Sequence, residues 1–220
     1  MMIDHSVFLL APADWTLLAK GLSMTLWLTL VGSVFTMLIG VLLAMVRFLM
    51  PPPFNWFGTF YVDSIRSMPL VLYLVLIFVL LPVPPFERAV FAMATFNGAF
   101  VAEIIRAAVE SLDETQFNAA LVLGLNPVQV FLRVALPQAM ARMVPALINQ
   151  FNTLLKDTSL VSMGMLELAK ASNILIERSW DEAFKVILIV SAMYFVLCLL
   201  LSLFGQVVEH HLKPWTRQPA

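Results

Sequence analysis

Long runs of apolar residues, each close to the length that crosses a lipid bilayer, dominate this chain. A bilayer core is about 30 Å thick, so a crossing helix needs about 20 predominantly apolar residues. Of the 220 residues, 61% are hydrophobic and 12% are charged, and the mean hydropathy is +0.91. Soluble domains are about 45–50% apolar and about 25% charged. The composition therefore excludes a soluble enzyme, a disordered segment and a nucleic-acid-binding protein.

The apolar runs predict an all-α integral membrane protein with about five transmembrane helices. It forms a single transmembrane domain over residues 1–220, with spans at about 15–48, 61–81, 86–110, 136–157 and 183–207. Inside the first span, small residues recur at every fourth position, namely Gly32, Thr36, Gly40 and Ala44. Such a stripe is typical of a close approach between two helices in lipid.

Five crossings place the two termini on opposite sides of the membrane, and the Lys and Arg distribution predicts which side is cytoplasmic. The C-terminal side carries Arg47, Arg66, Arg106, Arg133, Arg142, Lys213 and Arg217. The other side carries Lys20, Arg88, Lys156, Lys170, Arg178 and Lys185. The bias is small, and it increases slightly because Lys156 falls within a predicted span. We expect the N-terminus outside and the C-terminus in the cytoplasm.

The sequence lacks the residues that several common functions require. The net charge of -1 provides no basic patch for nucleic acid, and the single cysteine, Cys198, provides no disulfide framework. His210 and His211 adjoin each other in a polar tail without nearby Cys or Asp, so no metal site is expected. None of the eight glycines is followed by Lys, as a phosphate-binding P-loop requires. Any ATP hydrolysis must therefore come from another subunit.

The predicted span 136–157 is a poor lipid-facing helix. Asn149, Asn152, Thr153 and Lys156 follow the spacing i, i+3, i+4, i+7 and therefore share one face. A polar face on a spanning helix must meet the protein interior or a water-filled path. The amides and Thr153 either line such a path or hydrogen-bond neighbouring helices. Lys156 and Asp157 either offer charges of both signs to a zwitterion or form a structural ion pair.

Two further pairs of opposite charge lie at i,i+3 spacing, Glu103 with Arg106 and Asp63 with Arg66. Each pair is consistent with anchoring at a helix end and with a role toward a ligand. Glu167 lies in the mixed region 159–181 that follows the predicted span 136–157. This region is expected at the surface, where Glu167 could meet a substrate or a docked protein.

Residues 115–134 predict two short helices joined by a tight turn. Gly124 suits the left-handed position that ends a helix, and Asn126 and Pro127 suit the first positions of the next one. The unit is too short to fold alone and too apolar to remain in water. It therefore needs a partner surface.

The same segment resembles the EAA loop in the membrane subunits of ATP-binding cassette (ABC) importers. The matching residues are Asn118-Ala119-Ala120, Gly124, Phe131 and Leu136-Pro137. Further stretches resemble permease subunits of polar amino-acid importers of the histidine, glutamine and glutamate type. They include Arg66-Ser67-Met68-Pro69-Leu70, Ala102-Glu103-Ile104-Ile105-Arg106 and Lys156-Asp157-Thr158-Ser159-Leu160. The likeness covers about residues 21–210, nearly the whole chain.

The resemblance implies a fold like that of type I ABC importers, with a cytoplasmic coupling-helix loop. It implies that Asn118, Ala119, Ala120, Gly124 and Phe131 couple the chain to an ATP-binding subunit. The family usually has Glu at the position of Asn118, so a neutral hydrogen bond would replace an ion pair there. The candidates for the substrate path are Asn149, Asn152, Thr153, Lys156, Asp157, Ser159 and Glu103.

The function that follows is the transmembrane subunit of an ATP-driven amino-acid importer in the inner (cytoplasmic) membrane. The chain itself is not an enzyme and holds no cofactor, because ATP and Mg²⁺ belong to the partner. The implied partners are an ATP-binding subunit dimer, a second permease subunit, identical or similar, and an extracytoplasmic solute-binding protein. The alternative is a self-contained, ion-coupled carrier. Such carriers often show inverted repeats, and the two halves of this sequence show none.

Overall fold

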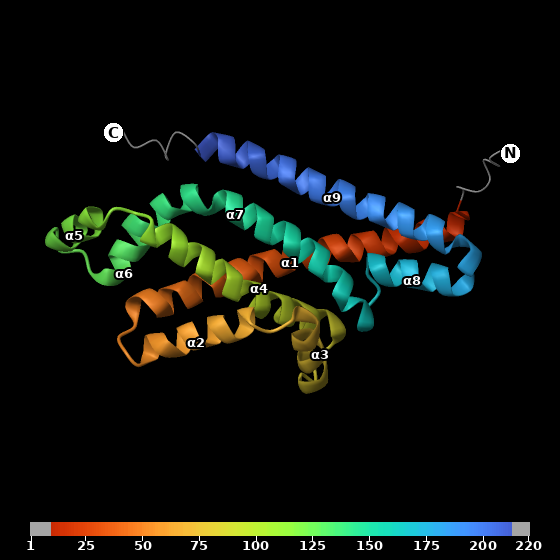
Figure 1. Ribbon diagram of the computed structural model, residues 1–220, viewed down its shortest axis with the longest axis horizontal. Coiled ribbons are helices and arrows are strands. Elements are labelled where there is room, and N and C mark those ends of the chain that lie inside the picture. The colour runs from red at the N-terminus through yellow and green to blue at the C-terminus, as the bar shows by residue number, and fades with distance from the viewer. Residues whose placement is uncertain (1–9, 213–220) are drawn as a thin grey trace.

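The computed structural model describes residues 10–212, which fold into helices joined by turns (Figure 1). The elements in chain order are α1 (Pro12–Leu49), α2 (Phe54–Arg66), α3 (Leu70–Leu80), α4 (Pro85–Glu110), α5 (Glu114–Val122), α6 (Pro127–Val130), a π-helical turn (Phe131–Ala135), α7 (Leu136–Asp157), a 3₁₀ turn (Thr158–Met163), α8 (Leu168–Arg178), a 3₁₀ turn (Trp180–Glu182) and α9 (Ala183–Leu212). The prediction of an all-helical membrane protein is confirmed.

Four stretches of helix are long and apolar enough to cross a membrane, and a bent pair provides a fifth candidate. The four are Pro12–Leu49, Pro85–Glu110, Pro127–Met163 and Trp180–His211. The pair consists of α2 and α3, which meet at 110°. The single helix expected over residues 61–81 is therefore broken. Pro69 provides the reason, because proline lacks an N–H group and disfavours helical backbone at the residue before it.

The long helices extend between two ends of an elongated bundle, and each end is formed by different parts of the chain (Figure 1). The last residues of α1 and α4 meet, since Phe48, Leu49 and Val109 line the same small cavity. The α5–α6 segment caps this end, which we call the loop end. α8 and the start of α9 lie at the opposite end with the start of α1, where Arg178 reaches Asp14 at 3.8 Å. The described ends of the chain accordingly lie at opposite ends of the bundle.

α1 and α4 pack closely through the stripe of small residues predicted from the sequence. Gly32, Thr36, Gly40 and Ala44 are all buried. A methyl group added to Gly40 would lie 2.6 Å from Val101 Cβ and 3.3 Å from the carbonyl oxygen of Gly98. Within a bilayer, apolar side chains gain no hydrophobic free energy by exchanging contacts with lipid for contacts with each other. Close van der Waals packing of this kind therefore holds membrane helices together.

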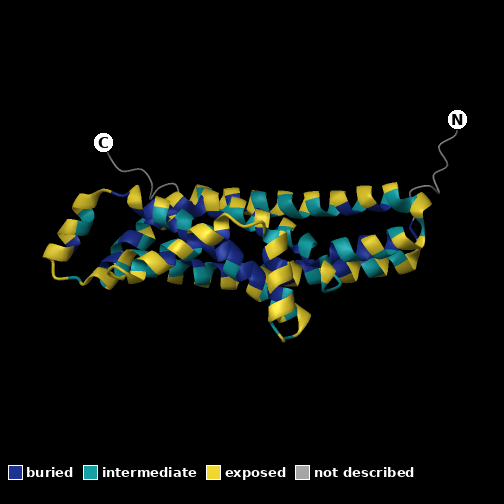
Figure 2. Cartoon of the chain, turned by 60° about the horizontal axis from the view of Figure 1, so that its bottom comes forward, coloured by how far each residue is buried: buried dark blue, intermediate teal, exposed yellow. Residues whose placement is uncertain are grey.

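Buried residues concentrate where α1, α4 and α7 meet, whereas α9 remains exposed along much of its length (Figure 2). Three apolar clusters form the core, one around α2–α4, one at the loop end and one joining the start of α1 to α8 and α9. Trp15 and Trp180 are exposed at one end, and Trp56 is exposed on α2. Tryptophan is enriched at membrane–water interfaces, and this placement fits a bundle whose long axis crosses the bilayer.

The close contact predicts that Gly40→Ala destabilises the protein, because an added methyl group overpacks the α1–α4 interface. Overpacking costs about 1–3 kcal/mol, which thermal unfolding of the purified complex would detect as a lower Tm. Gly32→Ala is the matched control on the same stripe, since its added methyl group would lie 3.7 Å from the nearest side-chain atom, Leu154 Cδ2. Equal Tm values for the two variants would contradict the assignment of the contact to Gly40.

Candidate functional site

The segment between α4 and α7 folds as the predicted pair of short helices. Asp113 caps α5 by accepting a hydrogen bond from the Thr115 N–H group at 2.9 Å. Its hydrogen bonds with Thr115 hold the pKa of the Asp113 carboxyl below its ordinary value. Asn126 and Gln129 form a reciprocal capping box at the start of α6, with distances of 2.9 and 3.0 Å. The turn between the two helices is therefore well defined by local hydrogen bonds.

Gly124 ends α5 in the left-handed conformation that the sequence predicts, with φ of 84°. The Gly124 N–H group donates to the Leu121 carbonyl at 3.0 Å, and the Leu125 N–H group donates to the Ala120 carbonyl at 3.2 Å. These two bonds form a Schellman motif, which satisfies carbonyl groups at the end of the helix. A methyl group at Gly124 would meet nothing within 4 Å, so the backbone angle alone, and not a lack of space, favours glycine.

The predicted coupling residues divide into two sets. Ala120 and Phe131 are buried, and Phe131 packs on Phe48 of α1 with ring centroids 5.6 Å apart. Asn118, Ala119 and Gly124 are exposed. Beside them Val122 and Leu123 are 88% and 82% exposed, respectively. The first set attaches the segment to the bundle, and the second forms an outward tip with apolar side chains, which we call the loop tip.

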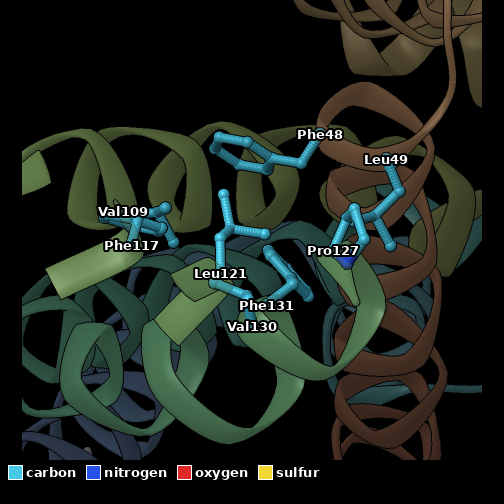
Figure 3. A pocket seen from close by; sticks show the side chains of 8 residues that line it. All are labelled: Phe48, Leu49, Val109, Phe117, Leu121, Pro127, Val130 and Phe131. Carbon is cyan, nitrogen blue, oxygen red and sulfur yellow. The ribbon is translucent and has the colours of Figure 1, made fainter. Parts of the chain in front are cut away.

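A small apolar cavity of ≈ 180 Å³ separates this segment from the ends of α1 and α4 (Figure 3). Its lining consists of Phe48, Leu49, Val109, Phe117, Leu121, Pro127, Val130 and Phe131. Every one of these side chains is apolar. The segment thus meets the ends of α1 and α4 through apolar contacts, and α6 continues through the π-helical turn into α7.

The polar face predicted for α7 lines a cleft of ≈ 440 Å³ against α9. The lining residues are Asn149, Asn152, Thr153, Lys156, Phe195, Cys198, Leu199 and Ser202. Asn149, Thr153 and Lys156 are exposed, which is unfavourable for polar groups facing lipid at this depth. We call this space the polar cleft.

Asn152 joins the two walls of the polar cleft and keeps one hydrogen-bonding atom unused. Its Nδ2 group donates to Ser202 Oγ of α9 at 2.9 Å. Its buried Oδ1 atom has no partner among the described residues. Assigning the amide the other way round would leave Nδ2 unused instead. In either assignment Asn152 bonds α7 to α9, as one of the two sequence hypotheses has it, and its remaining amide atom is buried.

Lys156 and Asp157 point to different sides of α7. Lys156 lines the polar cleft, whereas Asp157 interacts with the side chain of Asn97 on α4. Asn97 in turn accepts a hydrogen bond from Gln150 Nε2 at 2.6 Å. No ion pair joins Lys156 to Asp157 within residues 10–212, as expected for adjacent helical residues. Ser159 donates to the Lys156 carbonyl at 2.8 Å and so helps to end α7.

Glu103 lies apart from the polar cleft, at the centre of an ion network near the loop end. Arg47 of α1 approaches its carboxylate to 2.8 Å, Arg66 of α2 to 3.5 Å and Arg106 of α4 to 2.6 Å. Arg106 also pairs with Glu110 at 2.5 Å. The predicted Glu103–Arg106 pair is therefore present, but Arg66 turns to Glu103 rather than to Asp63. The network fixes α1, α2 and α4 to one another, and a place for Glu103 on the substrate path stays a prediction.

Glu167 is a buried residue and not a surface one, which differs from the expectation for this region. Its carboxylate accepts hydrogen bonds from the N–H groups of Ala169 at 2.8 Å and Lys170 at 2.7 Å, and from the Tyr194 hydroxyl at 3.0 Å. Burial raises the pKa of the Glu167 carboxyl, and these hydrogen bonds act in the opposite direction.

The contacts that sequence reasoning missed all join residues far apart in the chain. Asn97 with Gln150, Asn152 with Ser202, and Arg47 with Glu103 are separated by 53, 50 and 56 positions, respectively. The sequence indicates these contacts only through polar residues within apolar runs, such as Asn97 and Ser202. It indicates that a partner exists, but not which helix provides it.

Comparison with protein families finds one match that covers most of the chain. Residues 36–218 match the family described as binding-protein-dependent transport system inner membrane component.

Individual proteins show similarity over almost the full length. The L-cystine transport system permease protein TcyB of Bacillus subtilis (strain 168) is 33% identical over 210 residues, which cover 93% of this chain and 90% of that protein. The glutamate/aspartate import permease protein GltK of Escherichia coli O6:H1 is 35% identical over 202 residues, covering 84% and 89%. A solved structure described as an amino acid ABC transporter with histidines superposes with a TM-score of 0.81 at 31% identity, covering 96% of this chain and 100% of that chain.

The ion network predicts that Glu103→Gln destabilises the protein, because three guanidinium groups lose their shared counter-charge. Breaking a buried ion pair costs about 3–5 kcal/mol. The Glu103 side chain is 20% exposed, so we expect about 2 kcal/mol in thermal unfolding. Glu110→Gln is the matched control, since its side chain is 53% exposed and a surface pair contributes about 1 kcal/mol or less. A Tm for Glu103→Gln equal to that of Glu110→Gln would show that Glu103 is not the centre of the network.

Proposed function

The chain belongs to the family of binding-protein-dependent transport system inner membrane components as the permease subunit of an ABC amino acid importer, and from this premise we propose that the polar cleft is part of its substrate path. The predictions of an ABC permease, of amino acid transport and of a multi-pass inner membrane protein are confirmed. ATP hydrolysis lies in the partner subunit. The alternative of a self-contained, ion-coupled carrier is set aside.

The observation that carries the proposal is a set of exposed polar groups at membrane depth. Asn149, Thr153 and Lys156 lie on one face of a spanning helix and are exposed, although ionisable and amide groups are costly in hydrocarbon. A second permease subunit across this face would enclose the polar cleft and remove these groups from lipid. We therefore propose that two copies, or two similar subunits, face each other here.

The chemistry of the polar cleft suits the carboxylate group of an amino acid. Lys156 offers a positive charge to a carboxylate, and the exposed side chains of Asn149 and Thr153 offer hydrogen bonds beside it. In a low-dielectric site a substrate carboxylate needs such partners. Asp157 faces α4 beside Asn97 and lies outside the polar cleft. The relatives are named for the transport of different amino acids. We therefore propose recognition of the carboxylate that all amino acids share, which defines amino acids as the substrate class and does not select an individual one.

The loop tip supports a docking site for the ATP-binding subunit. Asn118, Ala119 and Gly124 face outward together with apolar side chains beyond the ends of α1 and α4. Since ATP is hydrolysed inside the cell, this end is cytoplasmic in the proposal. The opposite end, with α8 and Trp180, then faces outward and receives the solute-binding protein. The orientation agrees with the Lys and Arg distribution, of which Lys213 and Arg217 lie outside the described residues.

We expect Lys156→Met to raise the KM for amino-acid uptake about tenfold or more, because a hydrogen-bonded charge contributes about 1.5–3 kcal/mol. The measurement is radiolabelled uptake across the twenty amino acids in proteoliposomes that hold the chain with its partners. Uptake should require both ATP and the solute-binding protein.

Lys156→Arg keeps the charge and should restore most of the uptake. Lys185→Met is the control outside the polar cleft, since Lys185 pairs with Glu182 at 3.1 Å. Wild-type affinity in Lys156→Met, with uptake intact, would remove Lys156 from the path.

At the loop tip, we expect Gly124→Val to uncouple ATP hydrolysis from uptake, because its backbone angle excludes a β-branched residue. A side chain in this region costs about 1–2 kcal/mol, whereas Asn adopts it readily. The ratio of ATP hydrolysed to amino acid transported should rise about fivefold in Gly124→Val and stay near the wild-type value in Gly124→Asn. An unchanged ratio in Gly124→Val would contradict a coupling role for this turn.

A further inference from the structure

Glu167 is buried at the end of the bundle opposite to the loop tip. Its carboxylate caps α8 and also bonds a second helix, α9. The residues that cap helices most often are Ser, Thr, Asp and Asn, whose short side chains bond the first N–H groups. Glu167 makes these two bonds, and it is completely buried. Burial of a carboxylate is costly unless every lone pair finds a donor. The longer side chain reaches one more donor, the Tyr194 hydroxyl of α9 at 3.0 Å.

The start of α8 is itself held firmly on α1. The Leu168 N–H group donates to Thr25 Oγ1 of α1 at 3.1 Å, and Thr25 is completely buried. A methyl group on Gly21 would lie 3.0 Å from Glu167 O and from Ala171 Cβ, so the two backbones approach closely. α1 is in turn packed along α4. The Glu167 carboxylate is therefore a fixed point relative to the main bundle.

α9, by contrast, packs on α7 and α8 and remains largely exposed on its other sides. Only 11% of its most apolar stretch is buried, against 61% of the corresponding stretch in α4. The polar cleft lies on one side of it, and an apolar groove of ≈ 410 Å³ between α1, α7 and α9 lies on another. Further along α9, Ser202 bonds Asn152, and Gly205 packs closely on Ile148. The position of α9 beside the polar cleft thus depends on its contacts with α7 and α8, among which these polar and close contacts are fixed points.

Tyr194 is the fixed point nearest to the charged end of the polar cleft. Phe195 and Cys198, the next cleft-lining residues of α9, follow it directly. Tyr194 also lies against Thr158, which comes two residues after Lys156 in the segment that ends α7. One side chain of α9 therefore meets α8 through Glu167 and the end of α7 through Thr158.

We propose that Glu167 and Tyr194 are positioning residues, a pair that sets α9 against α7 and thereby shapes the polar cleft around Lys156. The pair touches no substrate and acts through the placement of the α9 wall. This inference rests on the proposed function of the polar cleft as part of the substrate path.

The test is Tyr194→Phe in the assembled transporter, since this change removes one hydroxyl and keeps the ring. We expect the KM for uptake to rise about five- to tenfold, with the maximal rate and the basal ATPase rate within about twofold of wild type. Cys198, the only cysteine of the chain, reports on the polar cleft independently of substrate. Its alkylation rate by N-ethylmaleimide, followed by the intact mass of this chain, should change at least threefold.

Tyr61→Phe is the matched control, because the Tyr61 hydroxyl donates to the Thr95 carbonyl at 3.2 Å between α2 and α4, away from the polar cleft. It should leave both the KM and the alkylation rate unchanged. Glu167→Gln keeps the size of the side chain and an acceptor for Tyr194, and should retain an alkylation rate close to that of wild type.

An alkylation rate of Cys198 in Tyr194→Phe equal to that of wild type would overturn the positioning role, whatever uptake does. A proportional loss of assembled complex, uptake and ATPase activity, with the KM unchanged, would overturn it as well, since that pattern reports a merely structural bond. A changed alkylation rate with an unchanged KM would uphold the Glu167–Tyr194 pair as the contact that places α9. The same result would overturn the proposed path through the polar cleft.

Discussion

The close packing of α1 against α4 is the interaction on which the other parts of the structure depend. In lipid, two apolar helices gain little by exchanging lipid contacts for each other, so their surfaces must fit closely. Gly40 and Gly98 provide this fit at the crossing. The contact aligns the two helices so that Arg47 meets Glu103, and Phe48 meets Phe131 at the base of the α5–α6 segment. The same long helix α1 then provides Thr25 as the seat of α8.

Polar groups within the bundle form separate joints at different levels, each linking different helices. Glu103 links α1, α2 and α4 near the loop end, Asn97 and Gln150 link α4 to α7, and Glu167 links α8 to α9 at the far end. In each case the groups satisfy one another, as a low-dielectric surrounding requires. The α7 face toward α9 differs, because Asn149, Thr153 and Lys156 remain exposed. That difference, and not the presence of polar residues as such, distinguishes the proposed substrate path from these joints.

Local features of this protein follow from its sequence, and long-range pairings do not. The turn at Gly124, the caps at Asn126 and Pro127 and the stripe around Gly40 are set by nearby residues and were predicted correctly. The face shared by Asn149, Asn152, Thr153 and Lys156 follows from helical periodicity alone. The distant partners of Glu103, which are Arg47 and Arg66, and the partner of Gln150 depend on which helices become neighbours, which periodicity does not encode. Pro69 indicates in the sequence that a helix breaks there. The angle of 110° between α2 and α3 does not follow from the proline, because both helices also pack against α4.

The distribution of strong and weak contacts indicates which parts of the chain move together. The segment around Gly124 is seated by Phe131 on the ends of α1 and α4, and the Glu103 network lies close above that seat. A displacement of the loop tip is therefore delivered to α1, α2 and α4 as one body, because these helices share ion pairs and close contacts. α9 shares few of these contacts and borders open space on two sides. In the proposed transporter, motion of α9 relative to this body breaks none of the ion pairs around Glu103, and the polar cleft lies beside α9, between it and α7.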